Sequence, residues 1–192
     1  MLGNARLYDL VQTLAGRFVT ARRLRALLAA TRGQVVLDLG AGTGSLAALL
    51  PSGATYWGLD NDALKVERLA AKVPGARVLQ RSALETGLDD DAADVTVCVD
   101  VTHHLEEREL PRLVAEMARV TRERLVFVDA LRARRFAVGR LLWRIDRGSY
   151  PRSEAELTDA LAAHFELTKV ERYRFWHHYV LCVARPRGGP LA

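Results

Sequence analysis

The 192-residue sequence predicts an α/β fold, in which a mostly parallel sheet is covered by helices. Two observations lead to this expectation. Short apolar runs rich in β-branched residues alternate with segments of helical apolar spacing, which is typical of parallel strands joined by crossover helices. The last two strand-like runs follow each other too closely for such a crossover. They therefore predict an antiparallel hairpin at one end of a mixed sheet.

The first two thirds of the chain contain five strand-like runs. These are VVLDL (35–39), TYWGLD (55–60), RVLQ (77–80), ADVTVCVD (93–100) and RLVFVDA (124–130). The helices expected between them are SLAALL (45–50), which Pro51 closes, DALKVERLAAKV (62–73) and ELPRLVAEMARVT (109–121). Ahead of the first strand, residues 4–31 carry helical spacing that is broken near Gly16, which predicts two helices.

The last third of the chain has a different order of elements. SEAELTDALAAHF (153–165) predicts a helix, because Ser153 suits its N-cap and Glu156 completes a capping box. ELTKVERYR (166–174) and WHHYVLCVA (176–184) predict the two strands of the hairpin. We expect residues 186–192 to form a disordered tail.

The composition is that of an ordinary globular chain, with 49% apolar and 27% charged residues. No run approaches the roughly 18 apolar residues that a membrane-spanning helix needs. Residues 1–10 contain three polar side chains where a signal peptide would need an apolar core. Cys98 and Cys182 both lie in apolar runs, which predicts buried thiols and excludes a disulfide framework. We therefore expect a cytoplasmic protein.

Positive charge gathers in two segments. Residues 1–37 hold six Arg and one Asp, and residues 130–152 hold seven Arg and one Asp. In the rest of the chain, acidic side chains outnumber basic ones. Three interpretations of the helical, basic stretch 132–148 stay open: it selects an anionic acceptor, it contacts an anionic membrane surface, or it packs on the core as an ordinary helix.

The sharpest local signal is the glycine-rich turn VLDLGAGTG (36–44), between an expected strand and an expected helix. Such a turn lets a ligand approach the backbone, with the N–H groups of a helix N-terminus facing it. A dinucleotide fingerprint would need G-x-G-x-x-G/A, but Ser45 occupies the third small position. Asp38 would repel a pyrophosphate and suits a cation. The turn therefore favours S-adenosylmethionine, which carries an ammonium and a sulfonium, over a dinucleotide.

With this turn, residues 35–183 resemble the class I, Rossmann-like S-adenosylmethionine-dependent methyltransferases. Within them, the chain is similar to the small-molecule branch of ubiquinone/menaquinone C-methyltransferase-like (methyltransferase type 11) proteins. The resemblance implies a three-layer αβα fold with a seven-stranded mixed sheet and a reversed final strand. It also implies N-terminal lid helices over 1–34 and a cofactor-binding domain over 35–185 with a basic insertion at 130–152. S-adenosylhomocysteine would be the product, and no metal would take part.

The resemblance further implies which residues bind the cofactor. Asp60 stands where the family binds both ribose hydroxyls, which one carboxylate can accept together. Ser82 departs from the family, which often has an Asp there for the adenine amino group, so we expect a weaker contact. Tyr8 resembles a tyrosine that closes over the cofactor. The full set of expected cofactor-binding residues is Asp38, Gly40, Ala41, Gly42, Gly44, Asp60, Asn61, Ser82, Ala83, Asp100 and Tyr8.

The candidates for a general base are His103 and His104 in CVDVTHHLE (98–106), which is similar to the family's fourth strand end and the His-His-Leu turn after it. They follow the carboxyl end of a parallel strand, where ligand sites of α/β folds form, and imidazole suits proton removal near neutral pH. The alternative is that one of them caps or packs beneath the next helix. His177 and His178 face opposite sides of a strand, which favours a structural or surface role. Neither pair has metal-ligand spacing, so we expect no metal site.

These observations predict a methyltransferase that acts on oxygen, carbon or nitrogen of a small-molecule or lipid-like acceptor. One alternative is a protein that binds S-adenosylmethionine or S-adenosylhomocysteine without catalysis. Another is a nucleic-acid methyltransferase, against which the 7% aromatic content argues. The Asn/Asp-Pro-Pro-aromatic motif of amino-methylating enzymes does not follow the fourth strand either. Neither the identity of the acceptor nor the oligomeric state follows from the sequence.

Overall fold

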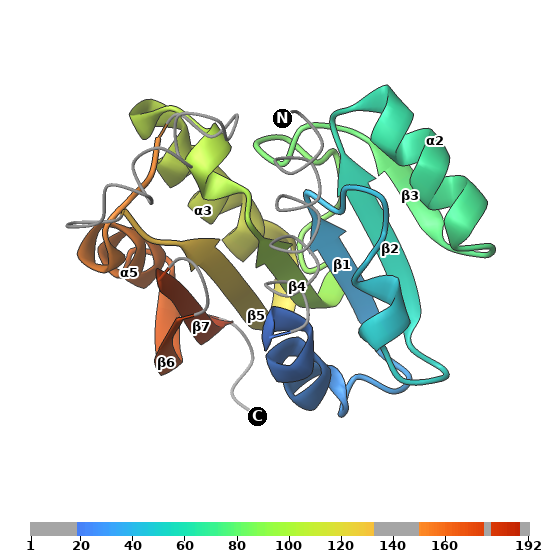
Figure 1. Ribbon diagram of the computed structural model, residues 1–192, viewed down its shortest axis with the longest axis horizontal. Coiled ribbons are helices and arrows are strands. Elements are labelled where there is room, and N and C mark those ends of the chain that lie inside the picture. Colours follow the sequence, from blue (N-terminus) through green and yellow to red (C-terminus); the bar gives the residue numbers. More distant parts are fainter. Residues whose placement is uncertain (1–18, 133–149, 175–177, 189–192) are drawn as a thin grey trace, which may run out of the picture.

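The computed structural model describes residues 19–132, 150–174 and 178–188. These residues contain one seven-stranded sheet in the order β3-β2-β1-β4-β5-β7-β6 (Figure 1). The strands are β1 (Val35–Leu39), β2 (Thr55–Asp60), β3 (Arg77–Gln80), β4 (Ala93–Val99), β5 (Thr121–Ala130), β6 (Phe165–Arg174) and β7 (His178–Pro186). The α-helices are α2 (Ala63–Lys72), α3 (Leu110–Val120), α5 (Glu154–Ala162) and a helix over 19–28. Three short 3-10 helices are η1 (Ala47–Leu49), η2 (Thr102–His104) and η3 (Glu107–Glu109).

The direction of the strands confirms the mixed sheet. Strands β1 to β5 pair in parallel with one another, whereas β7 runs antiparallel to both β5 and β6. The chain proceeds outward from β1 to β2 and β3 on one side, and continues with β4 on the other side. The carboxyl ends of β1 and β4 therefore lie at the point where the strand order reverses, which is where open α/β sheets bind ligands.

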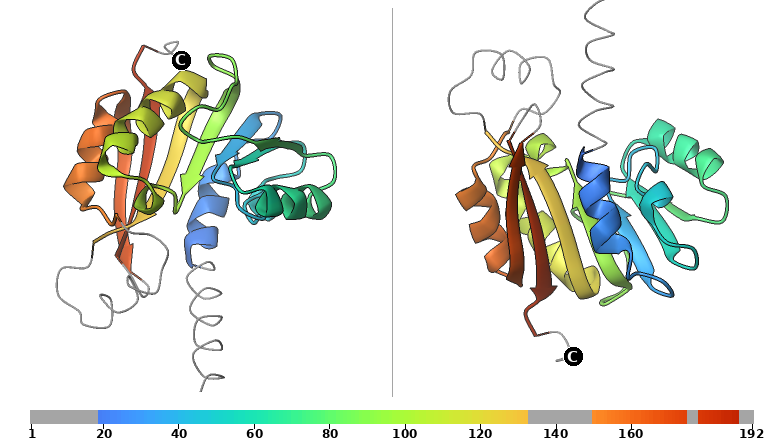
Figure 2. Two further views of the ribbon diagram at one scale, coloured as in Figure 1. Left: turned by 90° about the horizontal axis from the view of Figure 1, so that it is seen from above. Right: turned by 60° about the horizontal axis from the view of Figure 1, so that its bottom comes forward.

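Helices lie over both faces of the sheet (Figure 2), and each face has its own apolar core. On one face, buried side chains of α3 and α5, among them Leu113, Met117 and Leu157, pack against the sheet. On the opposite face, Leu24 and Leu28 of the 19–28 helix pack over Val95, Val97, Val126 and Val128 of the two central strands β4 and β5. The result is the expected three-layer αβα arrangement.

Polar contacts fix the 19–28 helix to the C-terminal hairpin. Thr20 Oγ1 lies 2.8 Å from the hydroxyl of Tyr173, and Arg23 Nε donates to Glu171 at 2.8 Å. The guanidinium of Arg23 also stacks over the Tyr173 ring, at 4.3 Å from its centroid. Tyr173 in turn stacks on Tyr179 of the adjacent strand. The first described helix and the last two strands are therefore joined across the sheet.

One predicted helix is wrong. Residues 45–50 do not form an α-helix, because the turn continues to Leu46 and only the 3-10 helix η1 follows. Gly44 adopts φ +75° and its N–H donates to Ala41 O, which closes a turn. Too few residues then remain before Pro51 for a stable α-helix to form. The expected helix N-terminus beyond the glycines is therefore missing, and the N–H groups of Gly40, Ala41 and Gly42 bind oxygens at the end of β2 instead.

Several sequence predictions fall on residues outside the described ranges. These are the first of the two N-terminal helices, with Tyr8, most of the basic stretch 132–148, His177 and the end of the tail. In the described part of the chain, no helix has both the length and the apolar character needed to cross a membrane.

Candidate functional site

The expected site residues lie along one edge of the sheet, where the parallel strands end. Asp38 lies near the end of β1, ahead of the glycine turn, and Asp60 ends β2. Asp100 follows β4 directly, and Asp129 lies one residue before the end of β5. Because these strands are parallel and adjacent, their carboxyl ends bring the four carboxylates to the same edge.

The glycine turn crosses over the end of β2. The N–H groups of Gly40 and Ala41 both donate to Leu59 O, at 2.8 and 2.9 Å. Gly40 has φ +76°, and a Cβ at this position would lie 2.4 Å from Cγ2 of Val101. Only glycine accommodates both this conformation and this close approach. The turn after β1 and the turn after β4 are therefore in direct contact.

Gly42 lies at the open side of the same turn. Its φ is +55°, and a Cβ built on it would have no atom within 4 Å. Its N–H donates to Asp60 Oδ2 at 2.9 Å. By contrast, a Cβ on Gly44 would meet Leu69 Cγ at 3.1 Å, so Gly44 packs against α2. Of these two glycines, Gly42 is the one that leaves space beside a buried carboxylate.

Asp60 is 5% exposed, and both of its oxygens are oriented by the backbone. Oδ2 accepts from Gly42 N–H, and Oδ1 accepts from Asp62 N–H at 3.0 Å, while Lys65 Nζ lies 3.8 Å from Oδ1. Each carboxylate oxygen has a second lone pair, so the group can accept two further hydrogen bonds side by side. Asn61, next in the chain, is exposed.

Asp38 is the most deeply buried of the expected cofactor residues, at 4% exposure. Its Oδ2 accepts a hydrogen bond from the hydroxyl of Tyr56 at 2.8 Å. Burial raises the pKa of Asp38 to about 7, and the charge of nearby Asp60 adds to this effect, whereas the Tyr56 hydrogen bond opposes it. Burial likewise raises the pKa of Tyr56, followed by the charge of Asp38. A cation bound beside this pair of carboxylates would favour the ionised form of Asp38.

Ser82 and Ala83 follow β3, next to the end of β2. Arg81 N–H donates to Asp60 O at 3.1 Å, which joins the two strand ends. Ser82 Oγ accepts from Leu84 N–H at 3.1 Å and is therefore used in a local turn. Its side chain is exposed and Ala83 is half-buried. The position lies at the expected edge of the sheet, but its hydroxyl already has a local partner.

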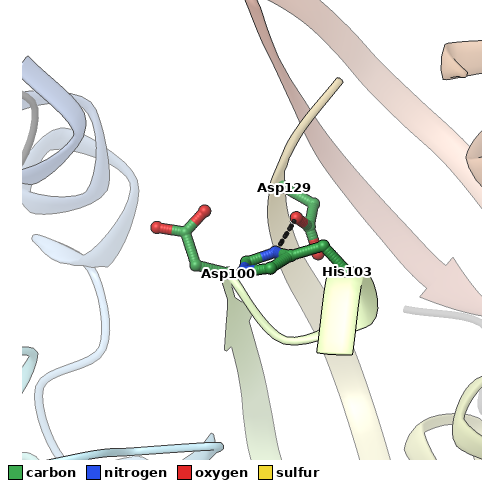
Figure 3. Close-up of side chains that lie close together, drawn as sticks. All are labelled: Asp100, His103 and Asp129. Carbon is green, nitrogen blue, oxygen red and sulfur yellow. Dashed lines mark hydrogen bonds and ion pairs between the residues drawn. The ribbon is translucent and has the colours of Figure 1, made fainter. Parts of the chain in front are cut away.

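His103 pairs with a buried aspartate that the sequence analysis did not select. His103 Nδ1 lies 2.8 Å from Asp129 Oδ1 (Figure 3). Asp129 Oδ1 also accepts from Ala130 N–H, and Oδ2 accepts from both the N–H and the hydroxyl of Thr102. Because the carboxylate accepts from backbone N–H groups on both oxygens, we assign the imidazole proton to Nδ1. The lone pair of the neutral ring then lies on Nε2.

The other two candidates of this turn differ from His103 in exposure. His104 is exposed, and its ring lies 4.1 Å from that of His103, centroid to centroid. Asp100 is also exposed and adopts φ +56°, an uncommon conformation for a residue other than glycine. Such conformations gather at functional sites, where the surroundings hold them in place. The structure thus brings His103 and Asp100 together and leaves His104 at the outer side.

Within the described ranges, Asp100, His103 and Asp129 form a group whose ligand atoms lie within 4.8 Å of one another. Three such residues could in principle hold a cation. The four hydrogen bonds to Asp129, however, use all four of its lone-pair directions. We therefore interpret the pair of His103 and Asp129 as a hydrogen-bonded dyad, and the expectation of a metal-free site remains a prediction.

Comparison with known proteins identifies the domain. Residues 36–124 match the family model of a methyltransferase domain. Over these residues the chain is similar to a methyltransferase domain. The resemblance to S-adenosylmethionine-dependent methyltransferases drawn from the sequence is therefore confirmed, and the matched residues span the glycine turn, Asp60 and His103. No curated protein matches the sequence.

Solved structures, among them methyltransferases, share the fold of this chain at low sequence identity. Magnesium protoporphyrin IX methyltransferase from Synechocystis PCC 6803, with bound S-adenosylhomocysteine, is 20% identical, with 90% of this chain and 84% of that chain covered and a TM-score of 0.74. A protein of Pyrococcus horikoshii OT3 is 19% identical, with 91% of each chain covered and a TM-score of 0.72. Geranyl diphosphate C-methyltransferase from Streptomyces coelicolor A3(2), in complex with Mg²⁺, geranyl diphosphate and S-adenosylhomocysteine, is 14% identical, with 89% and 81% covered and a TM-score of 0.73.

Proposed function

We propose that this methyltransferase binds S-adenosylmethionine over the glycine turn and methylates a small-molecule acceptor, with His103 as the general base. The observation that supports this most directly is the hydrogen bond between His103 Nδ1 and Asp129. It lies at the sheet edge, in the turn that contacts the glycine turn through Val101. A dyad of this kind orients an imidazole for proton removal next to the place where a cofactor would bind.

The residues of the glycine turn fit the cofactor in shape and charge. Gly42 leaves open space in front of Asp60, whose oxygens can accept two neighbouring ribose hydroxyls. Asp38 and Asp60 bring two carboxylates to one side of the site, which suits a ligand that carries an ammonium and a sulfonium. When bound, the cofactor supplies a methyl group activated by its positively charged sulfur. Two of the structurally similar methyltransferases contain S-adenosylhomocysteine.

His103 acts on the acceptor in this proposal. The proton of a hydroxyl or an acidic carbon moves to Nε2, and the positive charge that develops on the imidazole is stabilised by Asp129 at 2.8 Å. Asp129 also keeps the ring from rotating, because it fixes Nδ1 while the Thr102 contacts fix the backbone. His103 is buried and its ring is held by Asp129, whereas His104 is exposed, so we assign the base to His103 rather than to His104.

The acceptor class rests on charge and on the solved relatives. A porphyrin and an isoprenoid diphosphate appear in the names of the similar enzymes, and both are small anionic molecules with a large apolar part. The basic segment 130–152 would suit an anionic acceptor or a peripheral contact with an anionic membrane. Of its arginines, however, Arg152 is buried, so it does not belong to a solvated basic face.

Buried Cys98 and Cys182 fit a reducing compartment, which supports a cytoplasmic location.

An acceptor screen tests the proposal. Phenols, quinols, isoprenoid diphosphates, anionic lipids and an RNA oligonucleotide would each be incubated with S-adenosylmethionine, and S-adenosylhomocysteine formation measured. We expect turnover with at least one small molecule and a loss of about 100- to 10,000-fold in His103→Gln, with His104→Gln close to wild type. Turnover that is equal in wild type and His103→Gln would remove the base role. Turnover on RNA alone would favour the nucleic-acid alternative, and cofactor binding without turnover would favour the non-catalytic one.

A further inference from the structure

Arg152 has a buried guanidinium that reaches the turn carrying His103. The residue is 6% exposed although it lies outside the helices and the named strands, directly before the N-cap of α5. Nη1 donates to Thr102 O, and Nη2 donates to Leu105 O at 2.9 Å and to Glu106 O at 3.0 Å. One side chain thus binds three carbonyl oxygens of the segment that follows β4.

The backbone of Arg152 is held beside the end of β5, the strand that contains Asp129. Leu131 and Arg152 form a parallel β-bridge, and Arg132 N–H donates to Arg152 O at 2.7 Å. Two residues before Arg152, Tyr150 N–H donates to His103 O at 3.1 Å. The same strand end therefore anchors both Asp129 and Arg152.

The turn of His103 is held from two sides by opposite charges. Asp129 accepts the N–H and the hydroxyl of Thr102 and the Nδ1 proton of His103. Arg152 donates to the carbonyl of the same Thr102. The N–H and C=O groups of this residue, next to His103, are thus fixed by an anion and a cation respectively. Removing a guanidinium from water costs free energy, and burial lowers the pKa of Arg152. The hydrogen bonds of the side chain must therefore offset this desolvation cost.

We infer that Arg152 is a positioning residue, which fixes the His103 turn so that the imidazole keeps its hydrogen bond to Asp129. The inference rests on the proposed function only in assigning a reaction to His103. The hydrogen bond that Arg152 preserves exists whatever that reaction is. The planar fork of Arg is required, because a single lysine ammonium cannot reach the three carbonyl oxygens with the same geometry.

The direct test is the NMR signal of the Nδ1 proton of His103, recorded on the intact chain. A ring proton donated to a carboxylate gives a downfield resonance, which is assigned by its loss in His103→Gln. We expect Arg152→Gln to broaden or shift this resonance strongly and Arg152→Lys to restore part of it. The matched control is Arg132→Gln, which removes a guanidinium bound to Pro151 O and Glu156 beside the same bridge but leaves the His103 turn untouched.

Kinetics provide the second readout. With an acceptor in hand, Arg152→Gln should lower kcat by about 10- to 100-fold, as misplacement of a catalytic group does, with little change in KM for S-adenosylmethionine. An unchanged Nδ1 resonance in a folded Arg152→Gln variant would overturn the inference. If that variant does not fold, Arg152→Lys is decisive, because an unchanged resonance there would likewise overturn it. A shifted resonance together with normal turnover in His103→Gln would instead refute the proposed base while leaving the positioning role intact.

Discussion

Gly40 and Val101 lie so close that a single methyl group on Gly40 would overlap Val101 Cγ2, at 2.4 Å. Gly40 opens the turn expected to hold the cofactor, and Val101 opens the turn that carries His103. This contact joins the two halves of the proposed reaction. The turn proposed to hold the methyl donor and the turn that carries the proposed base are therefore packed against each other.

This contact predicts that one glycine variant mainly loses stability and that another mainly loses ligand binding. Gly40→Ala should destabilise the protein by about 2–4 kcal/mol, since it adds steric overlap to a strained positive φ. Gly42→Ala should cost only about 1 kcal/mol for its φ, but should weaken S-adenosylhomocysteine binding because its Cβ points into open space. Urea denaturation and calorimetric titration of both variants measure the two effects. In Gly40→Ala, the added change Val101→Ala should recover part of the stability, and equal stability of the two single variants would contradict the packing argument.

The buried Asp38 predicts that cofactor affinity depends on pH. The pKa of Asp38, about 7, means that the carboxyl is largely protonated below pH 7, whereas the ammonium group of a bound ligand favours the ionised form. Affinity for S-adenosylhomocysteine should therefore be constant above pH 7 and fall by up to about tenfold per pH unit below it. Titrations at pH 6 and 8 test this.

Two variants separate Asp38 from other titrating groups. Asp38→Asn should bind weakly, with the pH dependence removed. Tyr56→Phe removes a hydrogen bond that lowers the pKa of Asp38, so the inflection should move to higher pH. A wild-type pH profile that is unchanged in Asp38→Asn would assign the dependence to another group.

Asp60 is expected to contribute to cofactor binding through its two oriented oxygens. Asp60→Asn replaces one acceptor oxygen by an NH2 group, which cannot accept from the N–H of Gly42 or Asp62, and it removes the charge. We expect S-adenosylhomocysteine binding to weaken by about 2 kcal/mol, or roughly 30-fold. Asn61→Ala, at the exposed neighbouring position, is the comparison and should change the affinity less. Unchanged affinity in Asp60→Asn would remove this residue from the ribose role.

A separate prediction concerns stability at low pH. The hydrogen bond from Arg119, followed by those from Thr86, lowers the pKa of Glu116 to about 2. Glu116 therefore stabilises the folded state above its ordinary pKa of 4.5, and this contribution is lost as the pH falls from 4.5 toward 2. Glu116→Gln should cost about 1–3 kcal/mol at pH 7 and less at pH 3. Urea denaturation at both pH values measures it, with Asp90→Asn, an exposed partner of the same Arg119, as a control of small effect. An equal cost at both pH values would argue against the ionised network.

The strands and the glycine turn could be predicted because their signals are local. TYWGLD and RVLQ appear as β2 and β3 with the predicted bounds. The antiparallel pairing of β6 and β7 could be predicted from the short connection between them. SLAALL has helical spacing, which predicted an α-helix over residues 45–50. The turn closed at Gly44 and the proline at position 51 leave too few residues for that helix, so only η1 forms.

The parts of the site that the sequence analysis missed depend on tertiary contacts. Asp129 lies 26 positions from His103, and Arg152 lies 50 positions from Thr102. The only local signal for Asp129 was an acidic residue at the end of the apolar run VFVDA, similar to Asp38 in VLDLG. Arg152 gave none, because it stands in a segment rich in arginine and its burial depends on carbonyl groups that no residue pattern reveals.

We propose that the glycine turn binds S-adenosylmethionine or its product. The most direct measurement is calorimetric titration of the purified chain with S-adenosylhomocysteine at pH 8, with NAD titrated in parallel. We expect saturable binding of S-adenosylhomocysteine that is weakened in Asp60→Asn, and no binding of NAD. Binding of NAD in place of S-adenosylhomocysteine, or no difference between wild type and Asp60→Asn, would contradict it.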